Sequence, residues 1–120
     1  MPRYYPSKVK IGAQVFDILW LPTRDDAMLT DSSYGYTQDE RNIIVINVDL
    51  HDTKKKMTLF HEIMHAVRMV NEPSTKPQAG AEYGEWEHYF IGIFENSLLA
   101  VFQDNPKLTK WLLQGEESEK

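Results

Sequence analysis

Residues 61–65 read His-Glu-Ile-Met-His, within a stretch whose apolar residues recur with the 3.6-residue period of an α-helix. Asp52 or Thr53 is the expected N-cap of this helix, which continues to about Val70 and ends at Asn71. A helix of this length is stable in a small protein only if one of its faces is buried against other elements. The rest of the chain must therefore supply a surface that covers this helix.

The two faces of the predicted helix differ in chemistry. With about 100° per residue and His61 at zero, Thr58, Glu62 and His65 fall within an arc of about 100°. The remaining arc holds the large apolar residues, namely Met57, Leu59, Phe60, Ile63, Met64, Val67 and Val70. We therefore expect the apolar face to be buried and the face with the two His residues to open on a cleft.

The spacing of the two His residues in His-Glu-x-x-His is typical of a metal-binding site. Two His residues four positions apart lie one helical turn apart, so both imidazoles can bind one metal ion. The intervening Glu62 lies close enough to contact a water molecule bound to that ion. The chain has no cysteine and four His, so any metal site must be built from His, Asp and Glu. The alternative is that His61 and His65 are ordinary half-buried residues paired with carboxylates.

A catalytic zinc site needs a third protein ligand and keeps a fourth position for water. A second helix is predicted from about 85 to 103, and it offers two candidates. Glu87 projects into the apolar face of that helix, where a carboxylate needs a partner. His88 lies at the edge of the same face and carries the ring that zinc prefers. The other nearby candidates are expected at the surface or, for His51, at a helix cap: Glu82, Glu85 and His51.

The residues before position 52 predict β-structure. Residues 8–11 and 14–20 flank Gly12-Ala13 and predict a hairpin. Residues 34–37 and 43–47 predict a second hairpin, with the polar segment 38–42 as its connection. The strand 43–47 is either an exposed apolar edge, which would favour a binding partner, or a fully paired interior strand.

The length fits a single domain over residues 1–120, and its β-like N-terminal part followed by a helical C-terminal part predicts an α+β fold. Its predicted order is an N-terminal antiparallel sheet of two hairpins, the His-Glu-x-x-His helix, the second ligand-bearing helix and a short helix over 107–113. The charged tail 115–120 is expected to be disordered. A net charge of −5 argues against nucleic-acid binding, and no apolar stretch is long enough to span a membrane. The lack of cysteine suits a reducing cytoplasm.

Several of these segments together resemble a known family. They are residues 34–37, the strand that follows, residues 58–66 (Thr-Leu-Phe-His-Glu-Ile-Met-His-Ala) and a helix ending in Gln-Asp-Asn-Pro at 103–106. They resemble small phage-encoded zincin-like proteins, akin to the ImmA/IrrE-type metallopeptidases. The resemblance covers about residues 8–113, and only the His-Glu-x-x-His motif is individually specific.

The resemblance implies a zincin-like fold, a Zn²⁺ cofactor and hydrolysis of a peptide bond in a protein or peptide substrate. His61 and His65 would hold the ion, and Glu62 would be the general base for the metal-activated water. The family usually supplies a Glu as third ligand from the second helix. Here the aligned position is His88, with Glu87 beside it as the alternative. The resemblance also implies the cytoplasm, that of the host cell if a phage encodes the protein.

Two other functions stay open at this point. One is a zinc-binding interaction module of phage origin that has no proteolytic activity. The other is a structural domain whose His pair binds no metal. The intact Glu62 favours the peptidase, because a site that only binds zinc needs no base.

Overall fold

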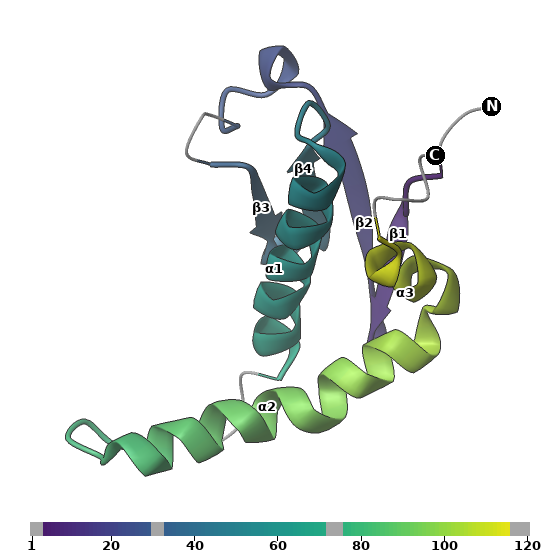
Figure 1. Ribbon diagram of the computed structural model, residues 1–120. Helices are drawn as coiled ribbons and strands as arrows, with labels where there is room; N and C mark the ends of the chain where they lie inside the picture. The colour runs from purple at the N-terminus through teal and green to yellow at the C-terminus, as the bar shows by residue number, and fades with distance from the viewer. Residues whose placement is uncertain (1–3, 30–32, 72–75, 116–120) are drawn as a thin grey trace.

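The computed structural model describes residues 4–29, 33–71 and 76–115, and these residues form one sheet and three α-helices (Figure 1). The strands are β1 (Lys8–Ile11), β2 (Gln14–Leu21), β3 (Gly35–Gln38) and β4 (Ile43–Asn47), and their order in the sheet is β1-β2-β4-β3. The helices are α1 (Asp52–Val70), α2 (Tyr83–Asp104) and α3 (Pro106–Leu113). The α+β class is thus confirmed.

Both predicted hairpins are present, but the sheet is mixed rather than antiparallel. β1 pairs with β2 around Gly12, whose φ of 61° explains why glycine occupies the tight turn. β3 pairs with β4 through the short 3₁₀ helix η2 (Asp39–Arg41). The two hairpins then join through a parallel β2–β4 pair, which makes the prediction of an antiparallel sheet wrong.

The reason for this arrangement lies in β4. Its residues Ile44, Val45 and Ile46 are all buried, so the strand has apolar side chains on both faces. A continuous apolar run of this kind is typical of an interior strand. β4 is therefore a paired interior strand, and the edges of the sheet are β1 and β3.

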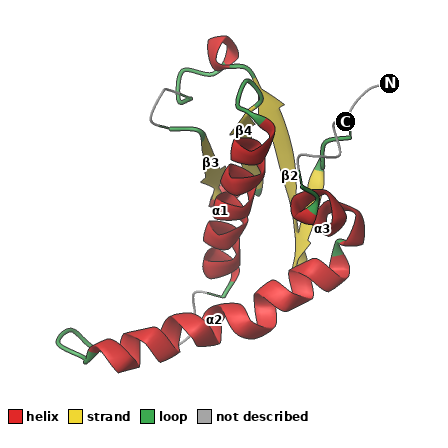
Figure 2. Ribbon diagram, viewed as in Figure 1, coloured by secondary structure: helices red, strands yellow, loops and turns green. Residues whose placement is uncertain are grey.

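Helix α1 packs on one face of the sheet, with contacts to β1, β3 and β4 (Figures 1 and 2). Its N-cap residue is His51 rather than the expected Asp52 or Thr53, so the helix begins one or two residues earlier than predicted. Helix α2 contacts α1 and β1, and α3 contacts α2. One short 3₁₀ helix, η1 (Thr23–Asp25), lies shortly after the end of β2. The predicted disorder of 115–120 falls, apart from Gly115, outside the described residues.

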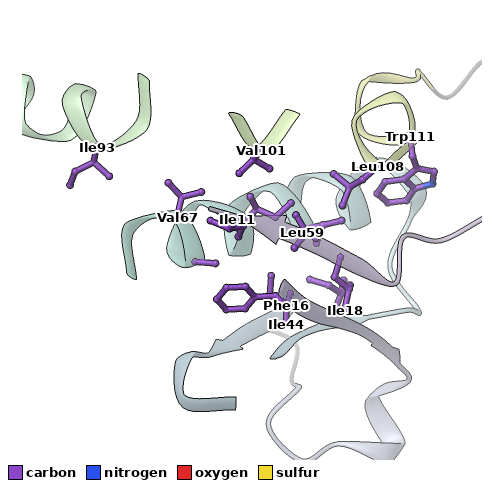
Figure 3. Packing of buried hydrophobic residues seen from close by; sticks show 14 residues of the cluster. Ile11, Phe16, Ile18, Ile44, Leu59, Val67, Ile93, Val101, Leu108 and Trp111 are labelled. Carbon is purple, nitrogen blue, oxygen red and sulfur yellow. The ribbon is translucent and has the colours of Figure 1, made fainter. Parts of the chain in front are cut away.

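One hydrophobic core joins the sheet to all three helices (Figure 3). The inward-facing residues of the strands meet the apolar face of α1, and α3 adds Leu108 and Trp111 at one end. The buried strand and α1 residues of this core are Val9, Ile11, Phe16, Ile18, Ile44, Ile46, Leu59, Ile63, Ala66 and Val67. The packing holds the His-Glu-x-x-His helix in a fixed orientation against the sheet.

Helix α2 departs from the expected packing. Of its residues only Ile93 and Val101 are buried, and its N-terminal part extends past the end of α1 (Figure 1). The radius of gyration is 15.7 Å, against about 14 Å for a compact domain of this size. The apolar face predicted for α2 is consequently half exposed, and Glu87 is exposed rather than embedded in a buried stripe.

Candidate metal centre

Helix α1 presents its motif residues in two directions. His61 and His65 are exposed, as expected for a face that opens on a cleft. Glu62 is only 6% exposed, and it turns with the buried Thr58 toward β3. Met57, placed on the buried arc from the sequence, is instead 59% exposed. The motif therefore places two exposed imidazoles beside a largely buried carboxylate.

The two imidazoles converge on one point. Their Nε2 atoms lie 3.1 Å apart, and the ring centroids are 4.7 Å apart at an interplanar angle of 77°. Two nitrogen ligands of a tetrahedral zinc ion, each about 2.0–2.1 Å from the metal, would lie about 3.3–3.4 Å apart. The donor pair thus fits a tetrahedral metal ion with a shift of only a few tenths of an ångström.

Glu62 has a hydrogen-bond partner from the neighbouring strand. The Oγ1 of Thr37 on β3 donates to Oε1 of Glu62 over 2.8 Å. β3 approaches α1 this closely at Gly35, where an added Cβ would lie 3.0 Å from the Thr58 methyl carbon. The carboxylate is therefore held from outside its own helix. Thr37 was missed in the sequence, where its only signal is alternation with Gly35 along one strand.

Two hollows meet at His61. The first lies between β3 and α1, has a volume of about 350 Å³, and includes Gly35, Thr58 and Glu62 in its wall. The second has a volume of about 260 Å³ and lies between α1 and α2. Its wall is formed by His61, Met64, His65, Arg68, Phe90 and Phe94. His61 borders both hollows, so a chain that crosses the His pair can contact Glu62 on one side and α2 on the other.

The structure brings together His61, Glu62 and His65, but not a third ligand. His88 and Glu87 are both exposed on α2, as are Glu82 and Glu85. Among the described residues, no group of three or more His, Cys, Asp or Glu side chains is placed to hold a metal ion.

His51 is excluded from the pair by its position at the start of α1. It precedes His61 by ten residues, which corresponds to about 15 Å along the helix axis. Its place at the N-cap, exposed and without a side-chain capping bond, matches the expected surface or capping residue.

The register of α2 bears on the choice between the two candidate ligands. Phe90 and Phe94 line the hollow beside His65. Glu87 precedes them by three and seven residues and so shares their side of the helix, whereas His88 is rotated away by about 100° from Glu87. The helix register therefore favours Glu87.

Comparison with known proteins gives one match. The family model described as Peptidase_M78, IrrE N-terminal-like domain, matches residues 13–97. This range runs from the start of β2 through α1 and into α2, and it includes the His pair and both candidate third ligands. No curated protein and no solved structure matches the chain. No helix in the described part of the chain has the length and apolar character needed to cross a membrane.

Proposed function

The chain belongs to the IrrE N-terminal-like domain family, Peptidase_M78, and on this basis we propose that it is a zinc-dependent metalloendopeptidase. The observation that carries the proposal is the convergence of the His61 and His65 Nε2 atoms, 3.1 Å apart, beside the carboxylate of Glu62. Its substrate is a protein or peptide.

His61 and His65 would supply two of the three protein ligands, and helix α2 the third. The third ligand is His88 by alignment, with Glu87 as the alternative that the helix register favours. When bound, a zinc ion lowers the pKa of a coordinated water molecule and polarises the carbonyl of the substrate.

Glu62 moves the proton. Because Thr37 donates to Oε1, the other oxygen, Oε2, is the atom that accepts the proton of the attacking water. The same oxygen then donates this proton to the amine that leaves when the peptide bond breaks. Thr37 fixes the carboxylate on the side of the pocket bordered by Gly35 and His61, which limits its rotation during the transfer.

Metal content is the first test. Purified protein should contain one zinc per chain, and His61→Ala should lose it, because a single imidazole from α1 cannot hold the ion. Zinc affinity measured in His88→Ala and Glu87→Ala identifies the third ligand as the variant with the larger loss. Zinc-free wild-type protein that folds identically to His61→Ala would contradict the proposal.

The role of Glu62 separates the peptidase from a zinc-binding interaction module. Glu62→Gln should keep the zinc and the fold, since Gln retains an oxygen that can accept the Thr37 hydrogen bond. Its proteolysis should fall by at least about 10²-fold, the scale of general acid–base catalysis. A biological effect that survives in this variant would favour the interaction module. Cytoplasmic location and phage origin stay predictions.

A further inference from the structure

Helix α2 carries a row of apolar side chains at the edge of the core. Phe90, Phe94, Leu98 and Phe102 follow one another at intervals of four residues, so they form one ridge along the helix. All four are half-buried or exposed. They line a groove of about 470 Å³, to which α1 contributes Met64. The ridge therefore borders an open groove instead of being enclosed by the core.

A second row beside this ridge is more exposed. Ile91 and Leu99 are 53% and 56% exposed, and Phe90 of the first row is 44% exposed. A large apolar side chain has about 150–250 Å² of surface, so these three leave roughly 300 Å² in contact with water. The half-buried residues of the groove add to this area. Two such surfaces in contact would bury roughly 1,000 Å² in all, which is the lower limit for a specific protein–protein interface.

The distribution of charge favours a second copy of the chain, packed in the antiparallel sense. The first half of α2 carries Glu85 and Glu87, and α2 contains no Lys or Arg. Helix α3, which follows the end of α2, carries Lys107 and Lys110. An antiparallel pair of α2 helices directs the acidic half of each toward the basic end of the other, whereas a parallel pair would bring the acidic halves together. The chain's own residues 116–120 include no apolar side chain that could fill the groove.

We infer that the protein forms a symmetric homodimer in which the α2 helices of two copies pack antiparallel through the surface around Ile91, Leu98 and Leu99. The inference goes beyond the proposed peptidase function and requires no bound metal. The centre of the apolar surface lies near residue 96, midway between Phe90 and Phe102. The hollow between β3 and α1 shares no wall residue with the groove, so the dimer leaves this approach to Glu62 open.

Sedimentation velocity of the full chain measures the association. The wild type should change from monomer to dimer between about 1 and 500 µM, because an interface near the lower size limit is weak. Ile91→Glu and Leu99→Glu should each raise the dissociation constant at least about tenfold, since each places a carboxylate in an apolar contact. Leu19→Glu is the matched control. Leu19 is 40% exposed and lies on β2 between residues that alternate toward the core, so it points to the face of the sheet away from the helices.

Introduced cysteines report the orientation of the two helices, because the chain has none of its own. In an antiparallel pair centred on residue 96, the two copies of position 91 lie about 15 Å apart along the helix axis, whereas position 91 of one copy lies within about 3 Å of position 99 of the other. An oxidised mixture of Ile91→Cys and Leu99→Cys should therefore form the mixed disulfide in preference to either self-linked dimer. Mass spectrometry counts the three products.

Glu95→Gln separates a second copy from a basic partner. Glu95 is exposed at the groove and lies one residue from the centre, so the two Glu95 carboxylates of a dimer approach each other. Glu95→Gln should therefore tighten the dimer, most clearly at low ionic strength. Glu40→Gln, at an exposed position of η2, is the matched control and should leave the dimer unchanged.

Several results would overturn the inference. One is wild-type protein that stays monomeric over the whole concentration range. Another is a dimer that neither Ile91→Glu nor Leu99→Glu weakens, because a different surface would then hold it. Preferential self-linking of Ile91→Cys would show a parallel pair and contradict the proposed arrangement, as would a dimer that Glu95→Gln weakens. Circular dichroism of every variant checks that a loss of dimer is not a loss of fold.

Discussion

Replacing Gly35 by alanine would add a methyl group at the closest approach between β3, β4 and α1. The new Cβ would lie 2.7 Å from the carbonyl oxygen of Val45, 3.0 Å from Cγ2 of Thr58 and 3.1 Å from Cδ1 of Ile46. All three distances are shorter than ordinary van der Waals contact. The Thr58 and Ile46 side chains can shift, but the Val45 oxygen belongs to the backbone of an interior strand and cannot move without disturbing the sheet.

The loss of folding stability caused by Gly35→Ala can be estimated from these distances. Overpacking of a well-packed site usually destabilises a protein by about 1–3 kcal/mol. For a domain of 120 residues the entropy of unfolding is about 0.25 kcal/mol per kelvin, so the melting temperature should fall by about 4–12 °C. Since β3 also carries Thr37, its displacement should weaken the hydrogen bond to Glu62 and lower peptidase activity further than the loss of folded protein explains.

Thermal unfolding followed by circular dichroism measures this effect, and the chain offers a control with the same substitution. Gly92 lies in α2 with nothing within 4 Å of an added Cβ, so Gly92→Ala should raise stability by about 1 kcal/mol through helix propensity. Adding Thr58→Ser to Gly35→Ala removes one of the three contacts and should restore only part of the loss. A melting temperature of Gly35→Ala equal to or above that of the wild type would refute the reasoning.

Substitutions at three further positions test other contacts. Thr37→Val should lower kcat about tenfold with little change in KM, and Thr37→Ser should restore it, as measured by steady-state kinetics on a cleaved peptide. Burial and the hydrogen bond to Asp26 raise the pKa of Tyr36 to about 12, so its contribution to stability is complete below pH 10 and is lost as the pH rises toward 12. The same hydrogen bond lowers the pKa of Asp26, so the contribution of Asp26 to stability is present above pH 3.8 and is lost on further acidification. The urea midpoint of Tyr36→Phe should therefore vary less with pH than that of the wild type, at both low and high pH. Asn105→Ala removes two hydrogen bonds of 2.9 Å to the backbone of Lys10 on the edge strand β1 and one of 2.7 Å to the carbonyl oxygen of Val101, and it should cost about 1–3 kcal/mol in urea unfolding.

The secondary structure was largely predictable because it depends on neighbours along the chain. The two-residue turn at Gly12-Ala13 and the period of 52–70 located the first hairpin and α1 to within one or two residues. Helix α2 begins at Tyr83, two residues before its predicted start, and its N-cap residue Glu82 makes no side-chain capping hydrogen bond. Helix ends are the least determined feature of such patterns.

The order of the strands was not predictable in the same way. Local alternation identifies a hairpin, but it does not say how two hairpins pair with each other. The parallel contact between β2 and β4 follows from the need to bury both faces of Ile44–Ile46, which only an interior position allows. The partner of Glu62 depends on this order, because β3 must lie at the edge next to α1 for Thr37 to donate to it.

The sequence by itself determined the convergence of His61 and His65, because a spacing of four residues on a helix sets the distance between two side chains through local hydrogen bonding alone. The tertiary structure decided the other contacts of the candidate metal centre. It buried Glu62 against Thr37, 25 residues away in the chain, and it set Phe90 of α2 beside His65. These contacts depend on which apolar faces of distant segments cover one another, and that choice is made by the packing of the whole core.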